Sequence, residues 1–307
     1  MFRFSRHQRV INVGGVRMGG QPGELPTAMA GTIFYHGQRL VKDPERGIFD
    51  QKQAEELVSA QASWSDQTGN PSLVHIYART PQAFCRYMSF IDQIWDGPVI
   101  ADSSQPTTRS CLAGLVTELG WADRVVYNSL SVATTQDEAD LLAGSEVDSA
   151  ILLAFNPAKS GVDGRIALLE TGGPGLPRGL MELAASCGVS NSILDPGVPP
   201  LGSGAGEALR FTVAAKAAWG LPVCLGMHNA ASSWIWLREK GRQIRQACDA
   251  STAALSVLAG CDLVLYGPME QAESAFAAAA FADILAAEAV ADLGIYPGTA
   301  HPRHRLI

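Results

Sequence analysis

The chain has 307 residues, of which 47% are hydrophobic and 17% are charged, and its formal net charge at pH 7 is -7. This length is long for one ordinary domain but normal for an eight-unit α/β barrel, so we predict one domain over residues 1–307. The charge shows no basic excess, and Arg303 and Arg305 near the C-terminus make only a short tail, which argues against nucleic acid as the principal partner.

Strand-like and helix-like segments alternate after a glycine-rich N-terminal extension of about residues 1–29. The predicted strand and helix pairs are 30–35 with 50–67, 73–77 with a helix from Thr80-Pro81, 98–102 with 107–120, 124–128 with 135–143, 149–155 with 177–187, 191–195 with 204–219, 222–227 with 232–259, and 262–266 with 270–292. In the fifth pair a long Gly/Pro-rich passage separates strand from helix. Eight such units predict a closed (β/α)8 TIM barrel, with an open, doubly wound sheet as the alternative.

Five of these strands deliver polar residues where the chain turns toward the next helix. These residues are Asp102, Asn128, Asn156, Asp195 and the pair His228-Asn229. Because the carboxyl ends of barrel strands open into one mouth, where barrel enzymes do their chemistry, we expect these side chains to share a pocket. The ordinary alternative for either Asp is a helix N-cap, and Asn128 or Asn156 could instead satisfy loop backbone.

The N-terminus and the apolar segments predict a cytoplasmic protein without membrane insertion. Residues 1–6 lack the apolar core of a signal peptide. The Ala-rich segment 275–291 is interrupted by Asp283 and Glu288, which favours a packed helix over a membrane span.

The cysteines predict a reduced protein without a metal site. The six cysteines are scattered, without a CxxC pair, and resemble core residues. Cys224 and His228 are the nearest candidate pair of ligands, but four residues along a strand span roughly 13 Å, too far to share one ion without a bend.

Two carboxylates and several amides in one pocket suit a pterin ring. The ring presents a guanidine-like edge, an N–H beside an exocyclic amine, whose two hydrogens a carboxylate can accept together. An Asn side chain supplies a donor and an acceptor, which matches the adjacent edge of carbonyl and ring nitrogen.

Several stretches, taken in order, also resemble a known family. They are GGQPGE at 19–24, GTIFY at 31–35, ADS at 101–103, DRVVYNS at 123–129, LAFNP at 153–157, PLGSGAG at 200–206 and HNAASSW at 228–234. Over nearly its whole length the chain resembles the family of the H subunit of tetrahydromethanopterin S-methyltransferase. That family includes related bacterial methyltransferases that move a methyl group between a corrinoid protein and tetrahydrofolate.

The resemblance implies a pterin-binding methyltransferase with a (β/α)8 barrel. Likeness at the strand ends to the wider group of pterin-binding barrels implies that Asp102, Asn128 and Asp195 anchor the ring. It places Asn229 beside nitrogen N5 as the catalytic residue, with His228 in a supporting role. Asn156 is a further candidate pterin ligand.

The resemblance also implies partners. The corrinoid would come on a separate protein, because the eight units use up the chain. The Ala-rich composition favours a bacterial source, and hence tetrahydrofolate over tetrahydromethanopterin as methyl acceptor or donor, and a homodimer is expected. Upstream of this step, bacterial relatives receive methyl groups from demethylated substrates.

Two further segments have more than one interpretation. The loop Gly202-Ser203-Gly204 does not directly follow a strand, so a dinucleotide site is poorly supported, and we expect it to let backbone approach a bound cofactor or partner. Trp234 and Trp236 either pack against the barrel or contact a docked corrinoid protein.

Two other functions remain open at this stage. A relative of dihydropteroate synthase should carry a Lys and an Arg on its last strands for a pyrophosphate leaving group, and the seventh and eighth predicted strands end in neither. The other possibility is a non-catalytic subunit that only tethers the corrinoid protein.

Overall fold

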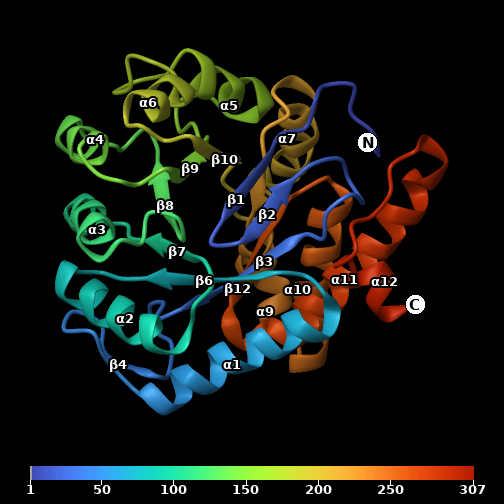
Figure 1. Cartoon of the computed structure of the whole chain (residues 1–307), viewed down its shortest axis with the longest axis horizontal. Coiled ribbons are helices and arrows are strands. Elements are labelled where there is room, and N and C mark those ends of the chain that lie inside the picture. Colours follow the sequence, from blue (N-terminus) through green and yellow to red (C-terminus); the bar gives the residue numbers. More distant parts are fainter. Residues whose placement is uncertain (1) are drawn as a thin grey trace.

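The computed structural model describes residues 2–307, which are built around an eight-stranded parallel sheet (Figure 1). Its strands are β3 (Ala28–Ile33), β6 (Ser72–Tyr77), β7 (Val99–Asp102), β8 (Val125–Leu130), β9 (Ser149–Leu153), β10 (Asn191–Asp195), β11 (Cys224–Leu225) and β12 (Leu263–Pro268). They lie in the order β10-β9-β8-β7-β6-β3-β12-β11. A parallel bridge between Leu194 and Val223 joins the two outer strands, so the sheet closes as the predicted barrel and the open sheet is excluded.

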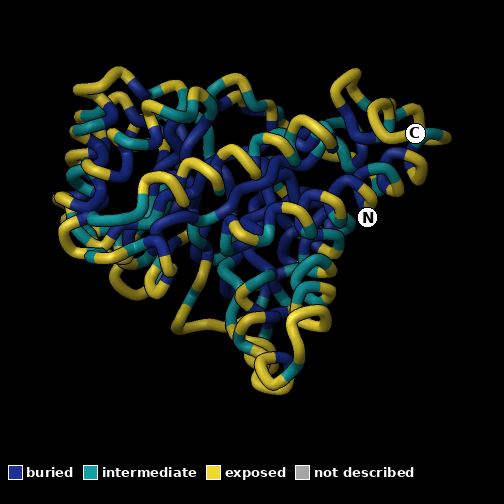
Figure 2. Tube along the Cα trace, turned by 90° about the horizontal axis from the view of Figure 1, so that it is seen from below, coloured by how far each residue is buried: buried dark blue, intermediate teal, exposed yellow. Residues whose placement is uncertain are grey.

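Helices surround the barrel, and Figure 2 shows buried residues through its centre and exposed residues along the outer helices. The α-helices are α1 (Gln51–Thr68), α2 (Pro81–Ile94), α3 (Pro106–Leu119), α4 (Gln136–Ala143), α5 (Gly161–Glu170), α6 (Leu180–Ser186), α7 (Ala205–Ala218), α8 (His228–Ser233), α9 (Ile235–Arg238), α10 (Arg242–Leu258), α11 (Ala272–Val290) and α12 (Pro302–Leu306). Two short 3-10 helices, η1 (Met269–Gln271) and η2 (Ala291–Leu293), flank α11. The Thr80 side chain caps α2 as predicted, by accepting from the Ala83 backbone.

Two segments differ from the sequence prediction. The Gly/Pro-rich passage contains a further helix, α5, in which a Cβ on Gly164 would lie 1.9 Å from the Lys159 carbonyl oxygen, so glycine is required by close packing. The long helix predicted over 232–259 is divided into α8, α9 and α10. The extended backbone of Trp234, with ψ of 106°, separates the first two, and Gly241 starts the third.

Side chains alternate along the strands between the barrel interior and the surrounding helices. In β6, Leu73 faces the interior, whereas Val74 and Ile76 pack in the layer shared with the helices. The lower interior layer is apolar and contains Ala30, Leu73, Ile100, Val126, Ile151, Ile193, Cys224 and Leu263. Two residues further along each strand, the upper layer contains Thr32, His75, Asp102, Asn128, Leu153, Asp195, Gly226 and Leu265. The barrel therefore presents its polar side chains at its carboxyl end.

The glycine-rich N-terminal segment forms a hairpin that closes the other end of the barrel (Figure 1). Strands β1 (Val10–Val13) and β2 (Val16–Gly19) pair antiparallel, and Gly14 and Gly15 make the turn with φ of 52° and 83°. The side chains of Ile11, Val13 and Met18 join the lower interior layer. A second small hairpin pairs β4 (Val41–Asp43) with β5 (Ile48–Phe49).

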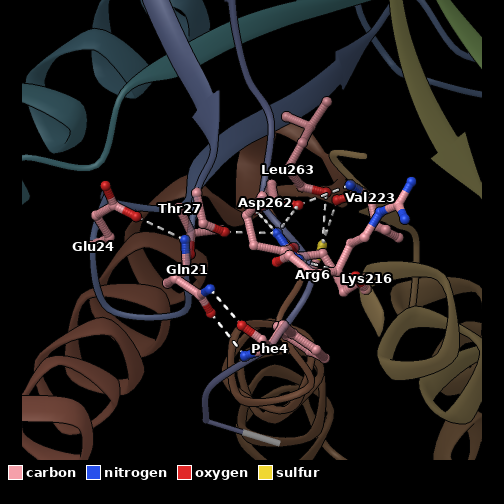
Figure 3. A network of polar contacts seen from close by, with 12 residues as sticks. Phe4, Arg6, Gln21, Glu24, Thr27, Lys216, Val223, Asp262 and Leu263 are labelled. Carbon is pink, nitrogen blue, oxygen red and sulfur yellow. Dashed lines mark hydrogen bonds and ion pairs between the residues drawn. The ribbon is translucent and has the colours of Figure 1, made fainter. Parts of the chain in front are cut away.

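A buried ion pair anchors this N-terminal segment to the barrel (Figure 3). The Lys216 ammonium donates to both Asp262 oxygens, at 2.7 and 2.9 Å, and to the Gly20 carbonyl at 3.0 Å. Asp262 also accepts from the Val223 backbone at 2.8 Å. Nearby, the Gln21 side chain bonds both backbone groups of Phe4. Because its groups are hydrogen-bonded, the pair can stay charged out of water.

The segment Met269–Leu293, which includes α11, is the only helical run in residues 2–307 whose length and composition would suit a membrane span, and half of its apolar stretch is buried. Asp283 in its middle accepts from the Thr27 backbone and hydroxyl at 3.0 and 2.7 Å and from Asn70 at 2.6 Å. These buried bonds tie the helix to the start of β3, as expected for a packed helix. The basic tail forms the short helix α12, preceded by the buried His301.

Candidate active site

A cavity of about 730 Å³ opens at the carboxyl ends of the barrel strands. Its volume lies in the range of small-molecule sites, roughly 300–1,000 Å³. Its lining includes the predicted residues Asp102, Asn128, Asp195, His228 and Asn229. Two other cavities, of about 670 Å³ between the N-terminal segment and Trp219 and of about 510 Å³ between β5 and α2, are lined by no carboxylate, so the barrel mouth is the candidate site.

Asp195 ends β10 and lies half-buried in this cavity. Its Oδ1 accepts from the Gly197 backbone at 2.8 Å, and within the described chain its Oδ2 makes no hydrogen bond. Burial raises the pKa of Asp195 to about 6, the Gly197 hydrogen bond opposes that rise, and the negative charge of Asp102 adds to it. At neutral pH Asp195 is therefore a carboxylate with one oxygen available to a ligand.

Asp102 ends β7 and belongs to a hydrogen-bonded chain across three neighbouring strands. Its Oδ2 lies 3.1 Å from His75 Nε2, and His75 Nδ1 lies 3.0 Å from the Thr32 hydroxyl. His75 and Thr32 are absent from the sequence prediction, which considers polar residues where the strands end rather than those inside them. Their signal is spacing, since each stands two residues beyond an inward apolar residue.

His228 and Asn229 open α8, directly above β11. The carbonyl of Leu265 can only accept, so His228 donates from Nδ1 at 2.8 Å, and its Nε2 keeps a lone pair. Burial lowers the pKa of His228 to about 4, so the ring is neutral at pH 7. A Cβ on Gly267, whose φ is 86°, would lie 2.5 Å from this ring, so the ring's position requires glycine there.

Asn229 is exposed at the cavity, and its side-chain amide forms no hydrogen bond with the described residues. The half-buried Asn128 side chain is likewise without a hydrogen bond to residues 2–307. Both amides can therefore give their donors and acceptors to a ligand.

A buried ion pair supports the loop after β7. Arg109 donates from Nε to Glu138 at 2.6 Å and from an Nη to the Ser103 carbonyl at 2.8 Å, and the Tyr127 hydroxyl also donates to Glu138. Arg109 is the only Lys or Arg among the described residues that line the cavity. Its charge is already matched by Glu138.

The other predicted ligands lie outside the cavity lining. The Asn156 side chain donates to the Gly164 carbonyl at 3.0 Å and accepts from the Ala158 backbone at 3.0 Å, so it orders the loop before α5. Gly202 and Ser203 stand in an exposed turn, and Gly204, with φ of 103°, precedes the first turn of α7. The cavity wall in this loop is formed instead by residues 197–200.

Trp234 and Trp236 lie on the surface beside α8 rather than in the barrel core. Their rings stack at 4.7 Å, and they are 37% and 48% exposed. Ser233 accepts from the Leu201 backbone at 3.0 Å, which joins this region to the loop that carries the cavity wall. We call the exposed side chains of Leu201, Trp234, Ile235 and Trp236 the rim patch.

Within residues 2–307, no group of three or more His, Cys, Asp or Glu side chains is placed to hold a metal ion. Cys224 lies in the lower interior layer, whereas His228 lies at the mouth and donates to Leu265. The expectation that the chain binds no metal stays a prediction.

Comparison with known proteins identifies the family. Residues 6–297 match the model of the tetrahydromethanopterin S-methyltransferase MtrH subunit. The chain is 46% identical over its full length, and over all of the relative, to the H subunit of the putative methyltransferase mtx of Methanosarcina mazei. It is 42% identical, again over all of both chains, to the H subunit of tetrahydromethanopterin S-methyltransferase of Methanothermobacter thermautotrophicus.

Solved structures show the same fold. Dihydropteroate synthase of Yersinia pestis, in a complex with a sulfonamide drug, superposes with a TM-score of 0.63 and 14% identity, over 93% of this chain and all of that one. The enzyme of Coxiella burnetii, in complex with pteroic acid, gives 0.60 and 14%, over 91% and 99%. At this identity the likeness concerns the barrel alone. The match to the family model and the full-length relatives show that the chain belongs to the MtrH family of tetrahydromethanopterin S-methyltransferase subunits.

Proposed function

We propose that this methyltransferase binds tetrahydromethanopterin in the barrel mouth and transfers a methyl group between its N5 and a corrinoid carried by a partner protein. The observation that carries the proposal is the cavity itself, in which two carboxylates, two amides without hydrogen bonds to the described chain and a neutral imidazole meet. Tetrahydrofolate, which the amino-acid composition favoured as the pterin, presents the same ring edge. The names of the relatives favour tetrahydromethanopterin, and we adopt it.

The carboxylates suit the guanidine-like edge of the ring. Asp195 keeps one oxygen free of protein bonds, and Asp102 is held through a single oxygen by His75. Each can accept a charge-assisted hydrogen bond from an N–H of the ring. Asn128, between them in strand order, supplies a donor and an acceptor for the neighbouring carbonyl and ring nitrogen.

The chemistry of N5 suits the part of the mouth above β11, which neighbours β10 around the barrel. Methylated N5 leaves poorly unless a donor stabilises it, and unmethylated N5–H must lose a proton. The corrinoid of the partner supplies or accepts the methyl group. Asn229 can donate to N5 or accept from N5–H without being ionised, and the lone pair of neutral His228 offers a second acceptor beside it.

The lining argues against pyrophosphate chemistry of the dihydropteroate synthase type. That reaction needs cationic side chains for the leaving group, and Arg109 is already paired with Glu138. A tether without catalysis would not need the two carboxylates or the free amides.

The partner assignments are part of the proposal. We infer that the rim patch contacts the corrinoid protein, because it is apolar, exposed and next to the cavity wall. Phe281 and Leu285, 61% and 40% exposed on α11, offer a surface for the expected homodimer. We infer a cytoplasmic location for the chain.

Calorimetry with tetrahydromethanopterin and tetrahydrofolate, side by side, tests the function. We expect saturable one-site binding, tighter for tetrahydromethanopterin, and methyl transfer when a methylated corrinoid protein is added. Glu55→Gln, on the exposed side of α1, is the matched control. If the folded protein binds neither pterin, the proposal is wrong; if it prefers tetrahydrofolate, only the choice of pterin is wrong.

A further inference from the structure

His75 is a buried side chain of the cavity floor, with 7% of its surface exposed. It lies in β6, between β3 and β7, which carry its two hydrogen-bonding partners. Its Nδ1 lies 3.0 Å from Thr32 Oγ1, and its Nε2 lies 3.1 Å from Asp102 Oδ2. Both ring nitrogens are therefore engaged inside the protein, and neither is free for a ligand.

The chemistry of the partners determines the direction of these bonds. An ionised Asp102 can only accept, so His75 must carry a proton on Nε2. In the neutral ring Nδ1 then holds the lone pair, and the Thr32 hydroxyl donates to it. The chain of donors runs from Thr32 through His75 to Asp102.

The Asp102 carboxylate is held in place by a side chain, whereas the Asp195 carboxylate is held by backbone. Within the described chain, the bond from His75 is the only hydrogen bond to the Asp102 carboxylate, whereas the Gly197 backbone holds Asp195. The two carboxylates share one cavity and repel each other, and that repulsion contributes to the raised pKa of Asp195. A donor on Asp102 offsets the repulsion and fixes which oxygen is bonded within the protein.

We propose that His75 is a positioning residue, which holds Asp102 by one oxygen so that the other oxygen is presented to the ligand, and that Thr32 sets its tautomer. The inference rests on the proposed function, because the ligand presented to Asp102 is the pterin ring. In this arrangement an outer residue orients a binding residue. Loss of the outer residue commonly lowers ligand affinity, although that residue touches no ligand.

Two substitutions of similar polarity separate positioning from packing. In His75→Gln the side-chain amide reaches the place of Nε2 and can still donate to Asp102. In His75→Asn the shorter amide reaches only the place of Nδ1, near Thr32. We expect His75→Asn to weaken pterin binding in calorimetry about 10-fold or more, and His75→Gln to keep it within about 3-fold. Equal losses in both folded variants, or none in His75→Asn, would overturn the positioning role.

The tautomer gives a readout that needs no ligand. In the wild-type protein, nitrogen-15 NMR of the His75 ring should show a protonated Nε2 and an unprotonated Nδ1, with the ring signals assigned by through-bond correlation to the His75 backbone. Protonation on Nδ1 alone would overturn the inferred chain even if both variants failed to fold. A wild-type protein with the expected tautomer but no pterin affinity would instead refute the proposed function, so the two failures are distinguishable.

Discussion

Asp195→Asn should remove both much of the pterin affinity and the pH dependence of binding. In the wild type the pKa of Asp195 is raised to about 6 by burial. The carboxylate is then ionised in roughly a tenth of molecules at about pH 5 and in roughly nine tenths at about pH 7. Since the ionised form accepts the ring hydrogens, the affinity of the wild type should rise about 10-fold over this interval.

The size of the loss follows from the contacts of the carboxylate. In the Asp195→Asn variant the carboxamide oxygen can still accept from the Gly197 backbone, so the loop should keep its shape. The remaining amide N–H₂ then faces ring donors that have lost their acceptor. Leaving such groups unpaired, and losing a charge-assisted bond, costs about 2–5 kcal/mol. Asp102→Ala should lose a similar amount.

Calorimetry at several pH values between about 5 and 7.5 measures both effects. His228, whose pKa is lowered to about 4, stays neutral over this range and does not contribute. In the ligand-free protein the raised pKa of Asp195 affects folding stability with the opposite sign to its effect on pterin affinity. The folded state binds the proton more tightly, so this residue's contribution to stability is lost as the pH rises through about 6.

Glu55→Gln, far from the cavity, should reproduce the wild-type curve. An affinity that is flat with pH in the wild type, or a slope that survives in Asp195→Asn, would show that another group controls binding. Unchanged affinity in the folded Asp195→Asn and Asp102→Ala variants would remove both residues from the site.

Three other outcomes test the chemistry, the partner and the fold. Asn229→Ala should lower the single-turnover transfer rate by about 10²-fold or more, while pterin affinity falls less than in Asp195→Asn. The reason is that a donor to N5 acts mainly in the transition state. A wild-type rate, measured by rapid-mixing absorbance, would exclude Asn229 from catalysis. The purified chain should be colourless and active only with added methylcobalamin or a methylated corrinoid protein, and corrinoid absorbance that persists through purification would contradict a partner-borne cofactor. Asp262→Ala should lower the free energy of unfolding in urea by about 3–5 kcal/mol, because it leaves the Lys216 ammonium buried without its partner. The double variant Asp262→Leu with Lys216→Met should recover part of the loss. Wild-type stability in Asp262→Ala would refute the inferred role of the pair.

The barrel and much of its mouth could be predicted because both depend on local pattern. Short apolar segments mark the strands, and a polar residue at the end of a strand marks the mouth, so Asp102, Asn128 and Asp195 were predicted together. The same rule misplaced Asn156, because β9 ends at Leu153 and the chain has left the barrel by the time it reaches Asn156. His75 and Thr32 were missed because their strands continue past them.

The sequence by itself determined the order of the strands and their following helices, the polar residues at the strand ends and the family, since these depend on residues close together in the chain or on long matching stretches. Only the tertiary structure decided which polar groups are free. His75, Arg109 and Asn156 have their side chains engaged by residues up to tens of positions away, whereas Asn128 and Asn229 have no such partners among the described residues. A hydrogen bond depends on distances of about 3 Å that barrel closure creates between distant segments, and no local pattern records them.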